Sequence, residues 1–251
     1  MVSFYRLLTT ATILVSAHAG PENPTETLQA RGVPPNSGYN GSFYYTWWSD
    51  GDTQAVYTNS AAGQYSLQWL GDTENVLGGK GWNPGTFSRQ VRSSSRQSRP
   101  QLAIALLNHF SFYRVINYSR AYRPNGDSSF SIYGWTRYPL IEYYIVESFG
   151  TSDPSRSAQK QGTLTCNGAS YDILQTTKLN QTSIDGTQTF QQFWSVRTPK
   201  KAPSQIIGSV DVACHFKGWA NAGMNLGSSF SYQIVATEGH QSSGSAIVMV
   251  A

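Results

Sequence analysis

The amino-acid sequence predicts an all-β fold, an antiparallel β-sandwich with one curved face. Three observations indicate it. From Gly38 onward, apolar and polar residues alternate in short runs, and turn signals such as Asn125-Gly126 and Asn167-Gly168 separate the runs. The composition is rich in Gly, Tyr, Ser and Thr, and only 13% of the residues are charged, which is typical of many short strands and turns. The length of 251 residues allows one all-β domain or two small ones.

We expect a strand in each run that alternates between two turn signals. In chain order these runs are SFYYTWW (42–48), AVYTNS (55–60), QYSLQWL (64–70), SFSIYGWTRY (129–138), LIEYYIVESF (140–149), TLTC (163–166), SYDILQTT (170–177), QTFQQFWSV (188–196), SSFSYQIVAT (228–237) and SAIVMVA (245–251). One helix is expected over CHFKGWANAGMNL (214–226), where Phe216, Trp219 and Gly223 recur at helical spacing. Asn225 or Gly227 would end this helix.

The N-terminal residues predict a secretory signal. Residues 1–19 place one Arg ahead of an apolar run that ends in Ala17-His18-Ala19, a small-residue cleavage pattern. Residues 20–31 have no strand or helix pattern and end in Arg31, so either a pro-segment trimmed after that Arg or an unstructured tail is expected. The mature protein is therefore predicted to be secreted.

Residues 87–114 depart from the surrounding turn rhythm. The segment carries five Arg and no acid, so without it the formal net charge of +4 would become −1. Because the positive charge is concentrated in one atypical block, the basic pI does not indicate a nucleic-acid partner. Two interpretations are open: an unspliced intron carried into the translation, or a long surface loop.

Cysteine usage fits an oxidising compartment. Cys166 and Cys214 are too far apart for a CxxC motif, and a single disulfide is the default interpretation. Sequons at Asn40, Asn117 and Asn180 permit glycosylation. No stretch is apolar and long enough to span a membrane, and no cluster of His, Cys and Asp has metal-ligand spacing.

Two glutamates stand in unusual places. In PLIEYYIVESFG (139–150) both strand faces are mostly apolar, yet Glu142 shares one face with Tyr144. A buried, unpaired carboxylate costs several kcal/mol or takes up a proton. In SYQIVATEGH (231–240), Glu238 shares a face with Tyr232. A lone glutamate of this kind is more often a strand-end acid facing solvent, but the two contexts match.

If the two strands are neighbours, their carboxyl groups can face each other across a cleft. Paired carboxylates are what cleavage of a glycosidic bond needs: one attacks the anomeric carbon while the other, kept protonated by its surroundings, donates a proton to the leaving oxygen. A separation of about 5–5.5 Å would imply retention of configuration through a covalent glycosyl-enzyme.

Outside residues 87–114, the chain from Gly38 to its last residue resembles the family 11 glycoside hydrolases, the small β-jelly-roll endo-1,4-β-xylanases. The motifs that carry the resemblance are GGKGWNPG (78–85), YGWTRYPLIEYYIVESFGT (133–151), SIDGTQTFQQFWSVR (183–197), HFKGWANAGMNLGS (215–228) and TEGHQSSGSA (237–246). The resemblance implies a single-domain β-jelly-roll sandwich of two curved antiparallel sheets with one short helix. It makes residues 32–251 the catalytic domain, interrupted by 87–114, and it matches Cys166 and Cys214 to a bridge found in some fungal members.

The resemblance also implies roles for individual residues. Glu142 matches the nucleophile and Glu238 the general acid/base. The residues that match substrate contacts are Trp48, Tyr44, Tyr133, Tyr144, Gln192, Tyr232, Lys178 and Ile184. Among them Trp48 is the stacking platform for a xylose ring, and Ile184 belongs to the tip, SIDG (183–186), of the long hairpin called the thumb, which closes over the cleft.

Some positions depart from the family pattern. Lys178 stands where Arg is usual, Thr182 where Pro is usual, and His240 where Tyr is usual. The first two affect the rigidity of the thumb more than the chemistry. Asn75 matches the residue that contacts the acid/base, and an Asn there goes with a pH optimum nearer neutral than strongly acidic, because a neutral amide adds no negative charge beside Glu238.

The expected protein is a secreted, monomeric, retaining endo-1,4-β-xylanase that acts on xylan and needs no metal or cofactor, with neither nucleic acid nor membrane as a partner. One alternative is a non-catalytic carbohydrate-binding protein on the same sandwich, which would be expected to lack one of the two acids. Another is a cellulase of the related jelly-roll kind, which would need room for the hydroxymethyl group of glucose.

Overall fold

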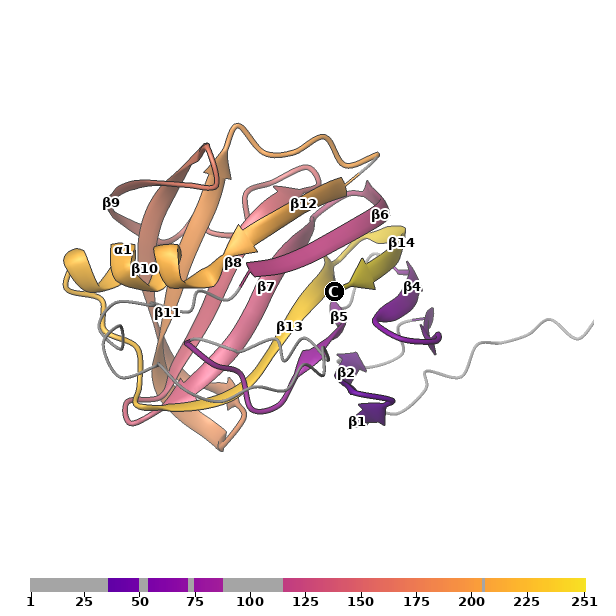
Figure 1. The fold of residues 1–251 in the computed structure, drawn as a ribbon, viewed down its shortest axis with the longest axis horizontal. Coiled ribbons are helices and arrows are strands. Elements are labelled where there is room, and N and C mark those ends of the chain that lie inside the picture. The colour runs from indigo at the N-terminus through magenta and orange to yellow at the C-terminus, as the bar shows by residue number, and fades with distance from the viewer. Residues whose placement is uncertain (1–35, 50–53, 72–74, 88–114, 205) are drawn as a thin grey trace, which may run out of the picture.

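The structure of the chain is a computed structural model that describes residues 36–49, 54–71, 75–87, 115–204 and 206–251. Within these residues two β-sheets and one helix form the fold, so the predicted all-β jelly-roll sandwich is confirmed (Figure 1). The predicted signal (1–19), the predicted pro-segment (20–31) and all but the first residue of the 87–114 segment lie outside the described residues.

Nine strands form the larger sheet. In spatial order they are β1 (Asn36–Asn40), β2 (Phe43–Ser49), β5 (Asn75–Trp82), β13 (Ser229–His240), β7 (Ser128–Arg137), β8 (Ile141–Phe149), β11 (Gly186–Thr198), β10 (Ala169–Ser183) and β9 (Gln159–Cys166). Neighbours pair antiparallel except β8 and β11, which run parallel. The smaller sheet has the order β12 (Ile206–Asp211), β6 (Val115–Asn125), β14 (Ser243–Val250), β4 (Gln64–Leu70) and β3 (Gln54–Asn59).

The two sheets are layers with a shared core. Figure 1 shows β6, β12 and β14 of the smaller sheet lying over β7, β8 and β13 of the larger one. The core between them takes one side-chain face from each strand, including Tyr65, Leu67, Trp69, Ile116, Tyr122, Ile132, Tyr143, Ile145, Phe193 and Val248. Burying aromatic side chains of this size stabilises the fold by about 2–3 kcal/mol each.

The opposite face of the larger sheet carries a second apolar cluster, which contains Tyr44, Tyr133, Trp135, Tyr144 and Trp194. Strand β8 therefore has buried residues on both of its faces. This explains why its sequence is apolar on both faces, and it means that Glu142 lies within the second cluster rather than in the core between the sheets.

The observed helix, α1 (Val212–Asn221), begins earlier and ends earlier than the predicted 214–226. The prediction missed the N-cap: the Asp211 carboxylate accepts hydrogen bonds from the backbone N–H groups of Ala213 and Cys214. Gly223, which was predicted inside the helix, follows it with a φ of +78°, a left-handed conformation that ends helices.

Four strands were not predicted: β1, β5, β6 and β12. Strand β5, NVLGGKGW, contains three glycines, which the strand propensities disfavour. Here the glycines are required by close packing. A Cβ atom on Gly81 would lie 2.2 Å from the carbonyl oxygen of Gln233, and one on Gly79 would lie 2.6 Å from that of Val235.

A disulfide joins Cys166, at the end of β9, to Cys214 in α1, as expected, with the two Cα atoms 6.0 Å apart.

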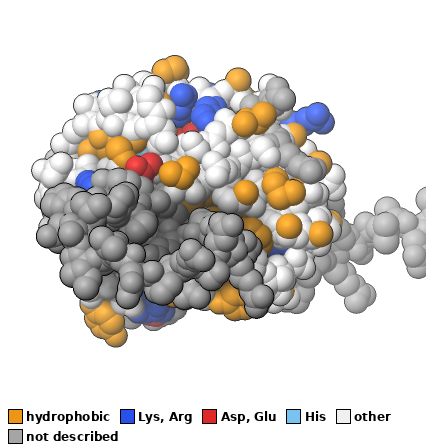
Figure 2. Space-filling model, in the orientation of Figure 1, with side chains coloured by type: hydrophobic (Ala, Val, Ile, Leu, Met, Phe, Trp, Pro, Cys, Tyr) orange, Lys and Arg blue, Asp and Glu red, His pale blue; other side chains and the backbone are white. Residues whose placement is uncertain are grey.

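Figure 2 shows one face of the molecule, on which apolar side chains lie in separate small groups. In the part of the chain that the structure describes, no helix is both long and apolar enough to cross a membrane.

Candidate active site

Strand β7 separates the two strands that carry the unusual glutamates. The order β13-β7-β8 places Glu238 and Glu142 on either side of it, so the two strands are not neighbours. In the register, Glu238 is opposite Ser129 and Glu142 is opposite Trp135, both residues of β7. Two strand spacings separate the backbones of β13 and β8 by about 9–10 Å, and the charge of Glu142 still acts on Glu238.

Glu142 is 7% exposed and accepts three side-chain hydrogen bonds. Its Oε1 atom accepts from the hydroxyl groups of Tyr133 and Tyr144, both at 2.8 Å, and its Oε2 atom accepts from Nε2 of Gln192 at 2.6 Å. Burial raises the pKa of Glu142, and these three donors and the charge of Lys178 act in the opposite direction. The donors offset the cost of placing a carboxylate in an apolar strand.

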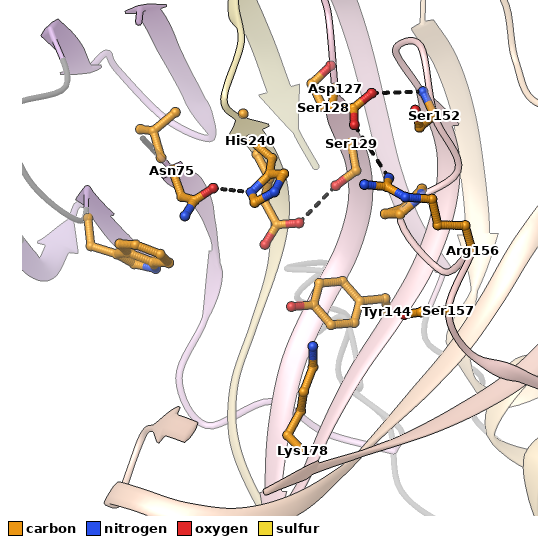
Figure 3. Close-up of a pocket in the computed structure, with 15 residues that line it drawn as sticks. Asn75, Asp127, Ser128, Ser129, Tyr144, Ser152, Arg156, Ser157, Lys178 and His240 are labelled. Atoms are coloured by element: carbon orange, nitrogen blue, oxygen red, sulfur yellow. Dashed lines mark hydrogen bonds and ion pairs between the residues drawn. The ribbon is translucent and has the colours of Figure 1, made fainter. Parts of the chain in front are cut away.

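Glu238 is half-buried and has a different environment. Its Oε2 atom accepts a hydrogen bond of 2.8 Å from the hydroxyl group of Ser129 (Figure 3). Burial raises the pKa of Glu238 to about 7, the Ser129 hydrogen bond opposes that rise, and the charge of Glu142 adds to it. At neutral pH and below, Glu238 is thus the carboxyl group suited to hold a proton.

The two acids line two adjoining parts of one cleft, which share Trp48 and Lys178. The part at Glu142 has a volume of about 610 Å³ and is largely aromatic, with Tyr133, Trp135, Phe190 and Tyr232 in its walls. The part at Glu238 has a volume of about 550 Å³ and is more polar, with Ser128, Ser129, Ser152, Ser157, Asp127 and Arg156 in its walls. Lys178 points toward Tyr144 (Figure 3).

Aromatic rings form a continuous series across the cleft face. Tyr44 stacks on Tyr232 with ring centres 5.7 Å apart, and Tyr133 lies 4.9 Å from Tyr144. Tyr144 in turn stacks on Trp194 at 4.0 Å. Rings of this kind offer apolar contact to the flat C–H faces of sugars, and their hydroxyl groups fix the position of a bound chain.

The structure brings most of the predicted substrate contacts together. The residues that line the cleft are Trp48, Tyr133, Tyr144, Gln192, Tyr232, Lys178 and Ile184. Tyr44 lies outside this set, since its 8% exposed ring packs against Tyr232 instead. Trp48 is 38% exposed, which leaves its ring accessible from the cleft.

The hairpin of β10 and β11 forms one wall of the cleft, with Thr182, Ser183 and Ile184 near its tip. At the tip, Asp185 forms an ion pair with Arg137 at the end of β7. Sequence reasoning missed Arg137 because nothing local to it signals a partner 48 positions away. It also missed Ser129, although counting back in twos from Tyr133 would have placed it on the same strand face.

Asn75 and His240 lie opposite each other on β5 and β13, and the His240 Nδ1 atom donates to the Asn75 Oδ1 atom. Both residues line the part of the cleft that contains Glu238. His240, which stands where the family usually has Tyr, is exposed and lies at the cleft. Among the described residues, no group of three His, Cys, Asp or Glu side chains could hold a metal ion.

Comparison with known proteins gives consistent matches. Residues 40–249 match the family described as glycosyl hydrolases family 11. The chain is 50% identical over 259 residues to endo-1,4-beta-xylanase 1 of Leucoagaricus gongylophorus, and the match covers 100% of both chains. It is 53% identical over 220 residues to endo-1,4-beta-xylanase A of Schizophyllum commune, covering 87% of this chain and 99% of the relative. It is 46% identical over 261 residues to endo-1,4-beta-xylanase 4 of Pyricularia grisea, covering 100% of this chain and 99% of the relative.

Proposed function

The chain belongs to glycosyl hydrolases family 11, and from that premise we propose that it cleaves internal β-1,4 linkages of xylan with retention of configuration at the anomeric carbon. Family membership and the xylanase relatives make it a glycoside hydrolase, an endo-1,4-β-xylanase. The observation that carries the finer proposal is the difference between the surroundings of the two acids: three side chains donate hydrogen bonds to Glu142, whereas burial raises the pKa of Glu238 to about 7.

In the first step Glu142 acts as the nucleophile. Its carboxylate oxygen forms a bond to the anomeric carbon of a xylose residue while the bond from that carbon to the glycosidic oxygen breaks. Glu238 donates its proton to the departing oxygen, so the leaving sugar chain departs as a neutral alcohol. Tyr133, Tyr144 and Gln192 hold Glu142 in place for the attack, which reduces the entropy lost on reaching the transition state.

In the second step Glu238, now ionised, acts as a base. It takes a proton from a water molecule whose oxygen attacks the anomeric carbon, and the bond between that carbon and Glu142 breaks. The two inversions together retain the configuration. Glu238 ends the cycle protonated, ready for the next substrate, and Glu142 ends it ionised.

The walls of the cleft bind the substrate. Trp48, with its exposed ring, is proposed as the platform on which a xylose ring stacks. Tyr232 and Lys178 offer a hydroxyl and an ammonium donor to sugar hydroxyl groups, and Ile184 contacts the chain from the tip of the thumb. Tyr44 supports this surface through its stacking on Tyr232. Asn75 modulates the titration of Glu238 from the neighbouring strand.

We further propose that the enzyme is secreted as a monomer and that residues 32–251 act as one catalytic domain. The Cys166–Cys214 disulfide supports an oxidising compartment. Expression of the chain with and without residues 87–114 tests whether that segment is compatible with activity. Equal activity of the two chains would favour a surface loop, and activity only after removal would favour a translated intron.

Two substitutions test the catalytic roles. Glu142→Gln and Glu238→Gln keep side-chain size, and each is expected to lower kcat on xylan by at least about a thousandfold. Reducing-sugar release from xylan and from soluble cellulose separates a xylanase from a cellulase, and NMR of the first product distinguishes retention from inversion. A Glu142→Gln enzyme with the parental rate, or a first product of inverted configuration, would end the proposal.

A further inference from the structure

Ser129 faces Glu238 directly across the β7–β13 pair. The two residues are opposite each other in the strand register, and the Ser129 hydroxyl group donates to Glu238 Oε2 at 2.8 Å. Ser129 is 2% exposed, so its hydroxyl group is largely shielded from bulk water. A hydrogen bond to a charged group in such an environment is stronger than one at the surface.

The hydrogen bond distinguishes the two oxygens of the carboxyl group. Because Oε2 accepts the Ser129 proton, Oε1 is the oxygen left to carry the proton that is transferred. A general acid is effective only when its proton points at the leaving oxygen. A fixed carboxyl group meets this condition in every encounter, whereas a freely rotating one meets it in only a fraction of them.

We propose that Ser129 is a positioning residue for Glu238, whose hydroxyl group selects the oxygen that delivers the proton and stabilises the carboxylate formed after delivery. The inference rests on the proposed role of Glu238 as acid/base. In this mechanism Ser129 acts through Glu238 and not on the anomeric carbon. Its effect therefore appears in the pH dependence and in kcat rather than in substrate binding.

Ser131 provides a matched control on the same strand. It is also fully buried, and its hydroxyl group has no hydrogen-bond partner within the described residues. Ser131→Ala removes the same atom as Ser129→Ala from a similar environment without removing a contact to Glu238. Ser129→Thr keeps a hydroxyl group at the proposed position and is the conservative variant.

The charged and titratable groups that face Glu238 stay in place in all these variants. They are Glu142, Asp127, Lys178, Arg156, His240, Tyr122, Tyr133 and Tyr144. Since Ser129 favours the ionised form of Glu238, its loss should raise the pKa of that carboxyl group by about one unit. The alkaline limb of the kcat/KM profile reports this pKa and should move upward with it.

The experiment compares the parent, Ser129→Ala, Ser131→Ala and Ser129→Thr by two measurements. One is the pH profile of kcat and KM on xylan, and the other is an NMR titration of the Glu238 side-chain carboxyl carbon, assigned with Glu238→Gln. For Ser129→Ala we expect both midpoints to rise by about one pH unit and kcat to fall about three- to tenfold with KM unchanged. Ser131→Ala and Ser129→Thr should follow the parent.

A Ser129→Ala protein whose titration and kcat coincide with those of the parent would overturn the role of Ser129. So would an equal shift in Ser131→Ala, because that would make the effect one of lost packing. An active Glu238→Gln enzyme would instead remove the proposed function itself. The NMR midpoint depends on no activity, so the two failures are distinguishable.

Discussion

Arg137, at the end of β7, holds Asp185, at the tip of the thumb, in a forked ion pair. Its Nε atom lies 3.0 and 2.8 Å from the two carboxylate oxygens, and its Nη2 atom lies 2.6 Å from Oδ1. Both side chains are 34% exposed. The pair joins the tip of the hairpin of β10 and β11 to the end of β7, so it holds the thumb in the position seen in the structure.

Disrupting this pair should weaken substrate binding more than folding. For Asp185→Asn we expect KM on xylan to rise about three- to fivefold and the rise to vanish at high salt, where the parental pair is itself screened. The free energy of unfolding should change by less than about 1 kcal/mol because the pair is exposed. Asp172→Asn breaks a comparable ion pair with Lys160, 2.8 Å long and outside the cleft lining, and serves as the control. Equal KM values for the two variants would contradict the role of the Arg137–Asp185 ion pair in substrate binding.

The pH dependence of activity should be bell-shaped, with an optimum nearer neutral than strongly acidic. Activity requires Glu142 ionised and Glu238 protonated, and burial raises the pKa of both. On the alkaline side, kcat/KM should fall as pH rises through about 7, where Glu238 loses its proton. Initial rates on xylan between pH 3 and 9, with enzyme pre-incubated at each pH to check stability, measure the profile. A maximum near pH 3 would show that the two pKa values are wrongly assigned.

The candidate acids could be found from the sequence because each stands in an uninterrupted strand pattern. Glu142 and Glu238 share strand faces with Tyr144 and Tyr232, and counting in twos was enough to place them. Periodicity says nothing about which strands become neighbours, however. That β7 would separate the two acids and supply Tyr133 and Ser129 depends on contacts between residues far apart in the chain.

The same reasoning explains the other misses. Strand β5 was not predicted because glycine has a low strand propensity. Its glycines are required by the close approach of the β13 backbone, which local sequence does not show. The helix start was misplaced because its cap, Asp211, ends a strand that has no clear alternation of its own. Local patterns predicted elements where local preference and tertiary packing agree, and failed where packing overrides it.

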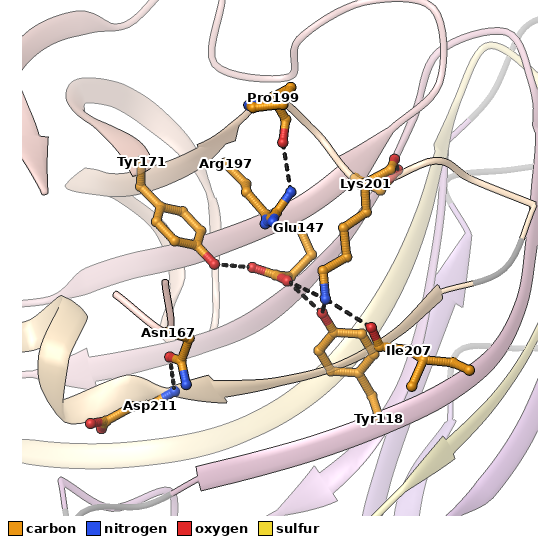
Figure 4. Close-up of polar contacts among 10 residues, drawn as sticks. Tyr118, Glu147, Asn167, Tyr171, Arg197, Pro199, Lys201, Ile207 and Asp211 are labelled. Carbon is orange, nitrogen blue, oxygen red and sulfur yellow. Dashed lines mark hydrogen bonds and ion pairs between the residues drawn. The ribbon is translucent and has the colours of Figure 1, made fainter. Parts of the chain in front are cut away.

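A buried carboxylate away from the cleft gives a prediction about stability. Glu147 is 1% exposed, and both Tyr118 and Tyr171 donate hydrogen bonds to it, while Lys201 pairs with it at 3.1 Å (Figure 4). Burial, together with the charge of Glu147, raises the pKa of both phenols, which keeps them protonated as donors. The cluster ties the chain after β11 to the end of β8.

Lys201→Met should therefore lower the free energy of unfolding by about 2–4 kcal/mol, because it leaves a buried carboxylate without its cation. Lys200→Met is the matched control, since the Lys200 ammonium group donates to the backbone carbonyls of Phe149 and Gly150 rather than to a carboxylate. Urea unfolding at pH 7 measures both. Equal losses in the two variants would mean that the ion pair adds nothing beyond ordinary contacts.

The disulfide should contribute a loop-closure term. It links residues 48 positions apart, for which the chain-entropy relation gives about 4 kcal/mol. We expect the free energy of unfolding of the Cys166→Ala, Cys214→Ala double variant, measured by urea unfolding, to be lower by about 4 kcal/mol. Its kcat should stay unchanged, because neither residue lines the cleft. The parent with reductant serves as a second route to the same state. A double variant as stable as the parent would show that strain in the native state cancels the entropic gain.

His215 should limit the stability of the protein in acid. It is fully buried in α1, both ring nitrogens have no hydrogen-bond partner within the described residues, and its ring meets the ring of Tyr171 edge-on at 4.5 Å. Burial lowers the pKa of His215 to about 3, whereas an unfolded chain titrates near 6.5. The unfolded state thus binds a proton that the folded state does not bind, so this contribution to stability is fully present above about pH 6.5 and is lost as pH falls toward about 3.

His215→Leu removes the titrating group. The free energy of unfolding of this variant relative to the parent should rise by about 3 kcal/mol between pH 8 and pH 4. Urea unfolding at the two pH values measures this, with His240→Gln, an exposed histidine, as the control. Parallel pH dependence in the parent and His215→Leu would mean that other groups set the acid limit.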